Sequence, residues 1–138
     1  MRTSRSLVVA GAALLLLAVA APALSHHAFS AEFDASKPIK FKGTVTKMLW
    51  VNPHAWIYVD VKKPDGTVEE WMIETGTPNT LLRRGLTKES LPTGTEITVD
   101  GYQSKDGSRR ANGRDLTLPN GQTLFLGSSG TGAPGEKK

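Results

Sequence analysis

The stretch WIYVDVKKPDGTVEEWMIET, residues 56–75, decides the fold class of this 138-residue chain. Residues 56–61 carry apolar side chains at alternate positions, a period of two that is typical of β-strands, and residues 67–75 form a second strand-like run. The segment Pro64-Asp65-Gly66 between the two runs is a strong turn signal. The stretch therefore predicts a β-hairpin.

Further elements lie on both sides of this hairpin. The same alternation predicts strands over residues 39–49 and 95–103, and turn signals at residues 106–107 and 119–121 precede a strand over residues 110–118 and a last short segment over residues 122–126. Directly after the hairpin, Thr77 fits a helix N-cap, Pro78 fits the first helical position and Gly85 fits the residue just past the end. A short helix over residues 78–84 is therefore expected.

The order of these elements indicates the fold. Three strands, a helix and two more strands are typical of a small OB-type barrel. Gly43 and Gly101 stand in phase with the apolar residues of their strands, which favours sharp bends or close backbone approach there. We predict an all-β fold with one short helix, a five-stranded OB-like Greek-key barrel. An open two-sheet sandwich is the alternative.

The first 25 residues have the layout of a secretory signal peptide. Arg2 and Arg5 precede an apolar run over residues 7–20, and small residues follow it up to Ser25. The run is shorter than the ~20 residues needed to span a bilayer. We expect cleavage, a periplasmic or secreted protein without a membrane partner, an OB-like domain over residues 26–126 and a disordered Gly/Ser/Pro-rich tail over residues 127–138.

Composition and charge exclude several classes of protein. With 38% hydrophobic and 22% charged residues, the chain is an ordinary globular protein. The net charge of +4 comes mainly from the signal and the last two lysines, so a nucleic-acid partner, which needs clustered Lys and Arg, is not expected. The chain has no cysteine, so neither disulfides nor thiolates are available.

Several segments resemble one family of proteins. They are His26-His27-Ala28-Phe29, Glu32-Phe33-Asp34, Gly43-Thr44-Val45, Asn52-Pro53-His54-Ala55-Trp56, residues 78–85 and Gly101-Tyr102. Together they resemble a family of small exported bacterial proteins recorded as a domain of unknown function, over essentially the whole mature chain. The resemblance implies export and an OB-like fold. It brings no settled activity, so the function must come from the residues.

The three histidines predict a copper site. A cut after Ser25 makes His26 the first residue, whose amine and imidazole can chelate one ion while His54 completes a nitrogen site that suits Cu(II). A cut after Ala23 instead gives a terminus in which His26 is third, and this terminus can also wrap Cu(II) in a plane. We predict copper binding by His26, His27 and His54, for carriage, buffering or delivery.

Two features qualify this copper hypothesis. Asp34 or Glu32 is expected to orient a ligating imidazole, because metal-bound histidines usually donate their other N–H. The alternative is that His26 and His27 form a solvated end and that His54 is an ordinary loop residue.

The aromatic residues of the hairpin give a second hypothesis. Trp56 and Tyr58 share one face of their strand, and Trp71 lies on the partner strand, so the three can form a platform. OB-type barrels bind ligands on this surface, which predicts a metal-free interaction module for a protein, glycan or other small ligand. The alternative is cross-strand packing.

No residues of the sequence form a catalytic set. Glu70 and Glu74 share a strand face, but we interpret them as part of a solvent-exposed strand edge. The sequence shows no recognisable set of nucleophile, base and orienting group. We predict a binding protein and no hydrolytic enzyme.

Overall fold

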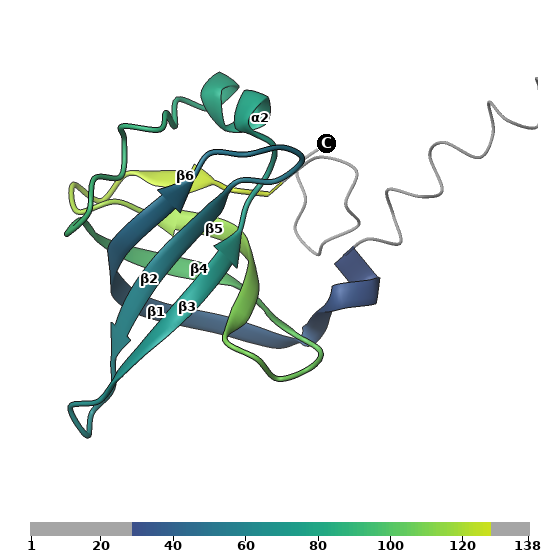
Figure 1. Ribbon diagram of the computed structural model, residues 1–138, viewed down its shortest axis with the longest axis vertical. Coiled ribbons are helices and arrows are strands. Elements are labelled where there is room, and N and C mark those ends of the chain that lie inside the picture. Colours follow the sequence, from purple (N-terminus) through teal and green to yellow (C-terminus); the bar gives the residue numbers. More distant parts are fainter. Residues whose placement is uncertain (1–28, 128–138) are drawn as a thin grey trace, which may run out of the picture.

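A computed structural model describes residues 29–127 (Figure 1). The elements follow one another as β1 (Phe33–Leu49), β2 (Trp56–Lys62), β3 (Val68–Glu74), α2 (Pro78–Arg83), β4 (Glu96–Ser104), β5 (Arg110–Thr117) and β6 (Thr123–Phe125). A single helical turn, residues 29–32, precedes β1. The predicted signal peptide, His26, His27 and the tail beyond Gly127 lie outside the described residues.

The strands form one sheet that closes on itself. Its order is β3-β2-β1-β4-β5-β6, and an additional pairing joins β3 to β5. That closing pair is parallel, whereas all the other pairs are antiparallel. The predicted all-β class with one short helix is confirmed, with the element order expected of an OB-like fold. A single closed sheet also excludes the two-sheet sandwich.

Strand β1 is longer than the sequence pattern predicts. It begins at Phe33, six residues before the predicted start, because it pairs with β4 from Phe33 and Ser104 onward. The extra residues 34–38 are mostly exposed, and the register shifts between Phe33 and Pro38, so this part shows no apolar alternation. The other predicted elements are confirmed to within one residue at each end.

The local signals for the hairpin turn and the helix act as expected. Thr67 donates its backbone N–H to the Asp65 carboxylate at 2.9 Å, which closes the turn. Thr80 donates its backbone N–H to the Thr77 hydroxyl at 3.2 Å, so Thr77 caps α2, and Gly85 beyond the helix has a φ of 86°. Within residues 29–127, no helix is long and apolar enough to cross a membrane.

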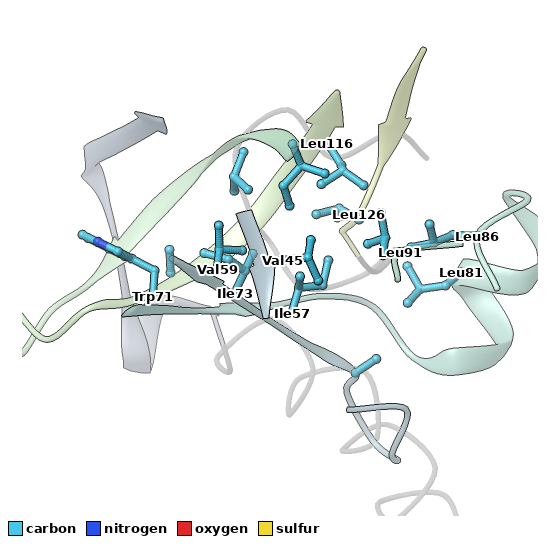
Figure 2. Packing of buried hydrophobic residues seen from close by; sticks show 14 residues of the cluster. Val45, Ile57, Val59, Trp71, Ile73, Leu81, Leu86, Leu91, Leu116 and Leu126 are labelled. Atoms are coloured by element: carbon cyan, nitrogen blue, oxygen red, sulfur yellow. The ribbon is translucent and has the colours of Figure 1, made fainter. Parts of the chain in front are cut away.

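The main core lies inside the ring of strands (Figure 2). Its fully buried residues include Val45, Ile57, Val59, Ile73, Ile97, Val99, Leu116 and Leu126. Trp71 lies at one end of the cluster, and Leu81, Leu86 and Leu91, from α2 and the turns after it, lie at the other. The helix therefore covers one end of the ring.

A second, smaller cluster lies outside the ring. Tyr102 alternates with the inward residues Val99 and Gly101, so it faces outward, yet it is only 6% exposed. Phe29 and Phe33 cover it, with the Phe29 ring 5.6 Å from the Tyr102 ring and 5.8 Å from the Phe33 ring. This cluster ties the N-terminal helical turn to the outer face of β4.

The close approach predicted at Gly101 gives a test of the fold. A Cβ at this position would overlap the backbone carbonyl oxygen of Asn112 on β5. We expect Gly101→Ala to lower the free energy of unfolding by about 2 to 3 kcal/mol, since overpacking against a fixed strand costs this much. Chemical denaturation measures it. Val68→Ala, at an exposed strand position, should stay within about 0.5 kcal/mol of wild type. Equal stability of Gly101→Ala and wild type would contradict the close packing of β4 on β5.

Candidate functional site

A pocket of about 340 Å³ lies between the N-terminal helical turn, the loop before β2 and the ends of β3 and β5. Its apolar lining comes from Phe29, Phe33, Val51, Pro53 and Trp56. Its polar lining comes from Glu32, Asn52, His54, Glu74, Arg110 and Asn112. Residues from two segments singled out in the sequence, 29–33 and 52–56, therefore contribute to the same pocket.

Strand register places the polar residues side by side. Glu74 is paired with Trp56 on one side and with Asn112 on the other, and Arg110 is paired with Met72. Paired residues project from the same face of a sheet. The intervening residues, such as Ile73, point into the core, so Trp56, Glu74, Arg110 and Asn112 share the outer face.

The loop that carries His54 is clamped to the end of β3. Ala55, fully buried, donates its N–H to the Gly76 carbonyl at 3.1 Å. The Ala55 carbonyl accepts hydrogen bonds from both the N–H and the hydroxyl of Thr75, each at 3.0 Å. Because Ala55 is fixed in this way, the preceding residue His54 is held beside Glu74.

The closest contact of the site joins His54 to Glu74. His54 Nδ1 lies 2.6 Å from Glu74 Oε1, and the side chains are 27% and 12% exposed. Nδ1 is inaccessible to solvent and makes no hydrogen bond of regular geometry. The contact is therefore a close ion pair in which the N–H does not point directly at the carboxylate oxygen. Nε2 is then the ring nitrogen left for another partner.

This environment favours the charged form of His54. The contact with Glu74 raises the pKa of His54 above its ordinary value of 6.5, and the opposing effect of partial burial is smaller. The Thr75 backbone and the charge of Glu32 act in the same direction as Glu74.

The carboxylate beside His54 differs from the expected one. Glu32 is paired with Arg110, and Asp34 is bonded to Ser36, so neither is the carboxylate in contact with the imidazole. Glu74, interpreted from the sequence as part of a solvated edge, takes that place. The signal for it was present, because a turn centred on Asp65 sets Glu74 opposite Trp56 in the hairpin.

A second charged pair lies across the pocket. The Arg110 guanidinium lies 2.9 Å from the Glu32 carboxylate and 5.5 Å from the centre of the Trp56 ring. The Glu32 carbonyl also accepts a hydrogen bond from the Lys105 N–H at 2.9 Å. Glu32 and Arg110 thus join the N-terminal turn to β5, and the turn forms one wall of the pocket.

The predicted aromatic platform does not form as a single surface. Trp71 is paired with Val59, faces the core and is only 9% exposed. Trp56 and Tyr58 alternate with the inward residues and remain half-buried on the outer face. Each of these rings has a cation over it, Arg110 over Trp56 and Lys47 over Tyr58. Of the three predicted residues, Trp56 is the one that lines the pocket.

The described part of the chain supplies one histidine of the predicted copper set. Within residues 29–127, no group of three His, Cys, Asp or Glu side chains is placed to hold a metal ion. His26 and His27 precede the described residues. Phe29, which lines the pocket with His54, follows His26 by three positions.

Comparison with known proteins gives one match. Residues 12–113 match a family model described as a family of unknown function (DUF6152). No curated protein and no solved structure matches the chain. The match covers most of the chain and carries no activity with it.

The His54–Glu74 contact predicts the outcome of Glu74→Gln. Without the carboxylate, the pKa of His54 should fall from its raised value toward or below 6.5, because the partial burial remains. NMR titration of the three histidines measures this, with His54→Gln to assign the resonance. Glu70→Gln, which changes an exposed carboxylate on the same strand, should leave the His54 pKa unchanged. The same His54 pKa in Glu74→Gln and wild type would show that the contact has no electrostatic effect.

The raised pKa also predicts how stability depends on pH. A group whose pKa is higher in the folded state stabilises the protein fully below its unfolded pKa, here near 6.5, and this contribution is lost as pH rises through the folded value. The difference in unfolding free energy between wild type and Glu74→Gln should therefore be largest near pH 6 and shrink at higher pH. Denaturation at a series of pH values measures it, and a difference that grows with pH would contradict the assignment.

Proposed function

This chain belongs to the family of unknown function (DUF6152), and we propose that it is an exported protein that binds copper through His54 and its processed N-terminus. One observation carries the proposal. His54, held by Glu74, lines a pocket whose opposite wall is the segment that begins three residues after His26. Its role is carriage, buffering or delivery of the ion.

The length of the chain before Phe29 supports a shared site. Phe29 is buried against Tyr102, so the start of the described segment is fixed in place. Three residues of extended chain span at most about 11 Å. This short covalent link to Phe29 supports the proposal that His26 and His54 share one ion.

The chemistry of His54 supports a metal ligand. A metal-bound imidazole usually directs its other ring nitrogen at a carboxylate, which fixes the ring and raises its basicity. Glu74 lies 2.6 Å from Nδ1, the position of such a carboxylate although without a regular hydrogen bond, and leaves Nε2 for the ion. Nitrogen ligands suit Cu(II), whereas a closed zinc site needs four His or Cys ligands and the chain has three histidines and no cysteine.

Export forms part of the same proposal. The basic start, the short apolar run and the small residues before His26 are the three parts of a cleavable signal. Cleavage after either Ala23 or Ser25 produces an N-terminus that chelates copper through its own amine. The periplasm or cell exterior is then the compartment in which the protein works.

The test combines the mature terminus with copper affinity. We expect mass spectrometry of the exported protein to find a terminus at Leu24 or His26. In Cu(II) titrations, His26→Ala and His54→Ala should each weaken binding by tenfold or more, since losing even the outer partner of a ligating histidine costs about 10- to 100-fold. His27→Ala should weaken binding in the same direction.

Val51→Ala is the matched control, because it changes an exposed pocket residue that has no donor atom, and it should bind as wild type does. A terminus upstream of Leu24, or wild-type affinity no better than that of the His26/His54 double variant, would contradict the copper site.

A second function, a metal-free interaction module, is favoured by a different observation. The pocket has five apolar lining residues, and its volume of about 340 Å³ falls in the range of roughly 300–1,000 Å³ that small-molecule sites occupy. We propose that this module takes a small ligand into the pocket beside Trp56, with the half-buried rings of Trp56 and Tyr58 on the outer face as its surroundings.

A further inference from the structure

A buried amide without a partner lies in the pocket. Asn112 is 7% exposed and contributes to the lining. Among residues 29–127, its side chain has no hydrogen-bond partner. Its amide atoms are not sealed from solvent, and Asn112 is one of the residues that line the pocket. A ligand that displaces water from these atoms must supply hydrogen bonds in its place, because an unpaired buried amide costs free energy.

We propose that the pocket binds a small neutral molecule that carries a carboxamide on a planar ring, and that Asn112 recognises the carboxamide. This inference rests on the second proposed function and is independent of copper.

The charges of the lining favour a neutral ligand. Glu32 is paired with Arg110 at 2.9 Å, and Glu74 with His54 at 2.6 Å. Both carboxylates and the Arg110 guanidinium are thus already in contact with a neighbouring side chain. A charged ligand would either break one of these pairs or enter the pocket without an opposite charge, and both cost free energy.

The shape of the lining favours a planar ring. Phe29, Phe33 and Trp56 surround the space with aromatic side chains, which pack well against another ring in stacked or edge-to-face geometry. The volume is at the small end of the usual range for ligand sites, so it admits a ring with one substituent better than a larger molecule.

The amide of Asn112 selects the substituent. It offers one carbonyl acceptor and two N–H donors side by side. A ligand carboxamide complements both, because its N–H can donate to Oδ1 while its carbonyl accepts from Nδ2. A bare ring, or a ring with only an acceptor, leaves part of Asn112 unpaired.

The experiment uses benzamide as the probe on metal-free full-length mature protein at fixed pH. Benzoate, benzylamine and toluene have the same ring and differ in charge or in hydrogen-bonding groups. We expect benzamide to bind at least tenfold tighter than each of the other three by ligand-detected NMR. Asn112→Leu, of similar size without hydrogen-bonding groups, should abolish the preference for benzamide over toluene. Asn79→Leu, at an exposed position on α2, should keep it.

A second measurement covers the case in which Asn112→Leu does not fold. In the wild-type protein, benzamide should shift the side-chain amide resonances of Asn112 and toluene should not. Benzoate or benzylamine binding as tightly as benzamide would overturn the neutral ligand. Equal binding of toluene and benzamide would overturn the role of Asn112 and leave the interaction module standing. No binding of any of the four compounds would overturn both the ligand and the module.

Discussion

The parallel pairing of β3 with β5 is the constraint on which the site depends. Only three residue pairs make it, Met72 with Arg110, Ile73 with Ala111 and Glu74 with Asn112. The middle pair faces inward and closes the core, and the outer two place Arg110, Glu74 and Asn112 on one face. The same short contact therefore completes the ring of strands and assembles the polar side of the pocket. If β3 and β5 separated here, the closed ring of strands and the polar side of the pocket would both be lost.

The N-terminal segment gives the outer face a second layer. Without Phe29 and Phe33, Tyr102 would be an exposed aromatic residue on the outside of the sheet and the pocket would have no wall on that side. The Glu32–Arg110 ion pair alone holds such a segment weakly, because exposed pairs contribute little. Burial of the two phenylalanine rings supplies most of the attachment. The N-terminal helical turn, which forms one wall of the pocket, is thus attached to the sheet mainly through apolar packing.

The strands and the helix were predictable because their signals are local. Alternation, the turn at residues 64–66 and the cap at Thr77 each act within a few residues, and the structure follows them closely. The start of β1 was not predictable, since residues 34–38 pair with β4 without presenting apolar side chains to a core. The hairpin register sets Trp71 opposite Val59, so Trp71 faces the core as Val59 does. The predicted platform was wrong for Trp71 because it placed this residue on the face of Trp56 and Tyr58 without deriving the register from the turn.

No local sequence pattern predicts the pocket itself. His54 and Glu74 are 20 residues apart, and Asn112 lies a further 38 along the chain. The parallel pairing of β3 with β5 brings Asn112 to Glu74. The loop that Ala55 anchors brings His54 to Glu74. Sequence reasoning could identify His54 as chemically interesting from its type and rarity. It could not find Arg110 or Asn112, whose importance comes entirely from the closure of the ring.

The charge balance of the pocket connects the two proposed occupants. In the metal-free protein with His54 protonated, Glu32 and Glu74 are matched by Arg110 and His54, and the lining has no net charge. If Cu(II) bound as proposed, it would displace the proton of His54 and that of the N-terminal amine, so two positive charges would replace two. A neutral ligand would therefore suit the charge balance of the pocket in either of the two proposed states. The two proposed occupants would share one pocket, and Glu74 adjoins the residues argued for each of them, because it contacts His54 and is paired with Asn112.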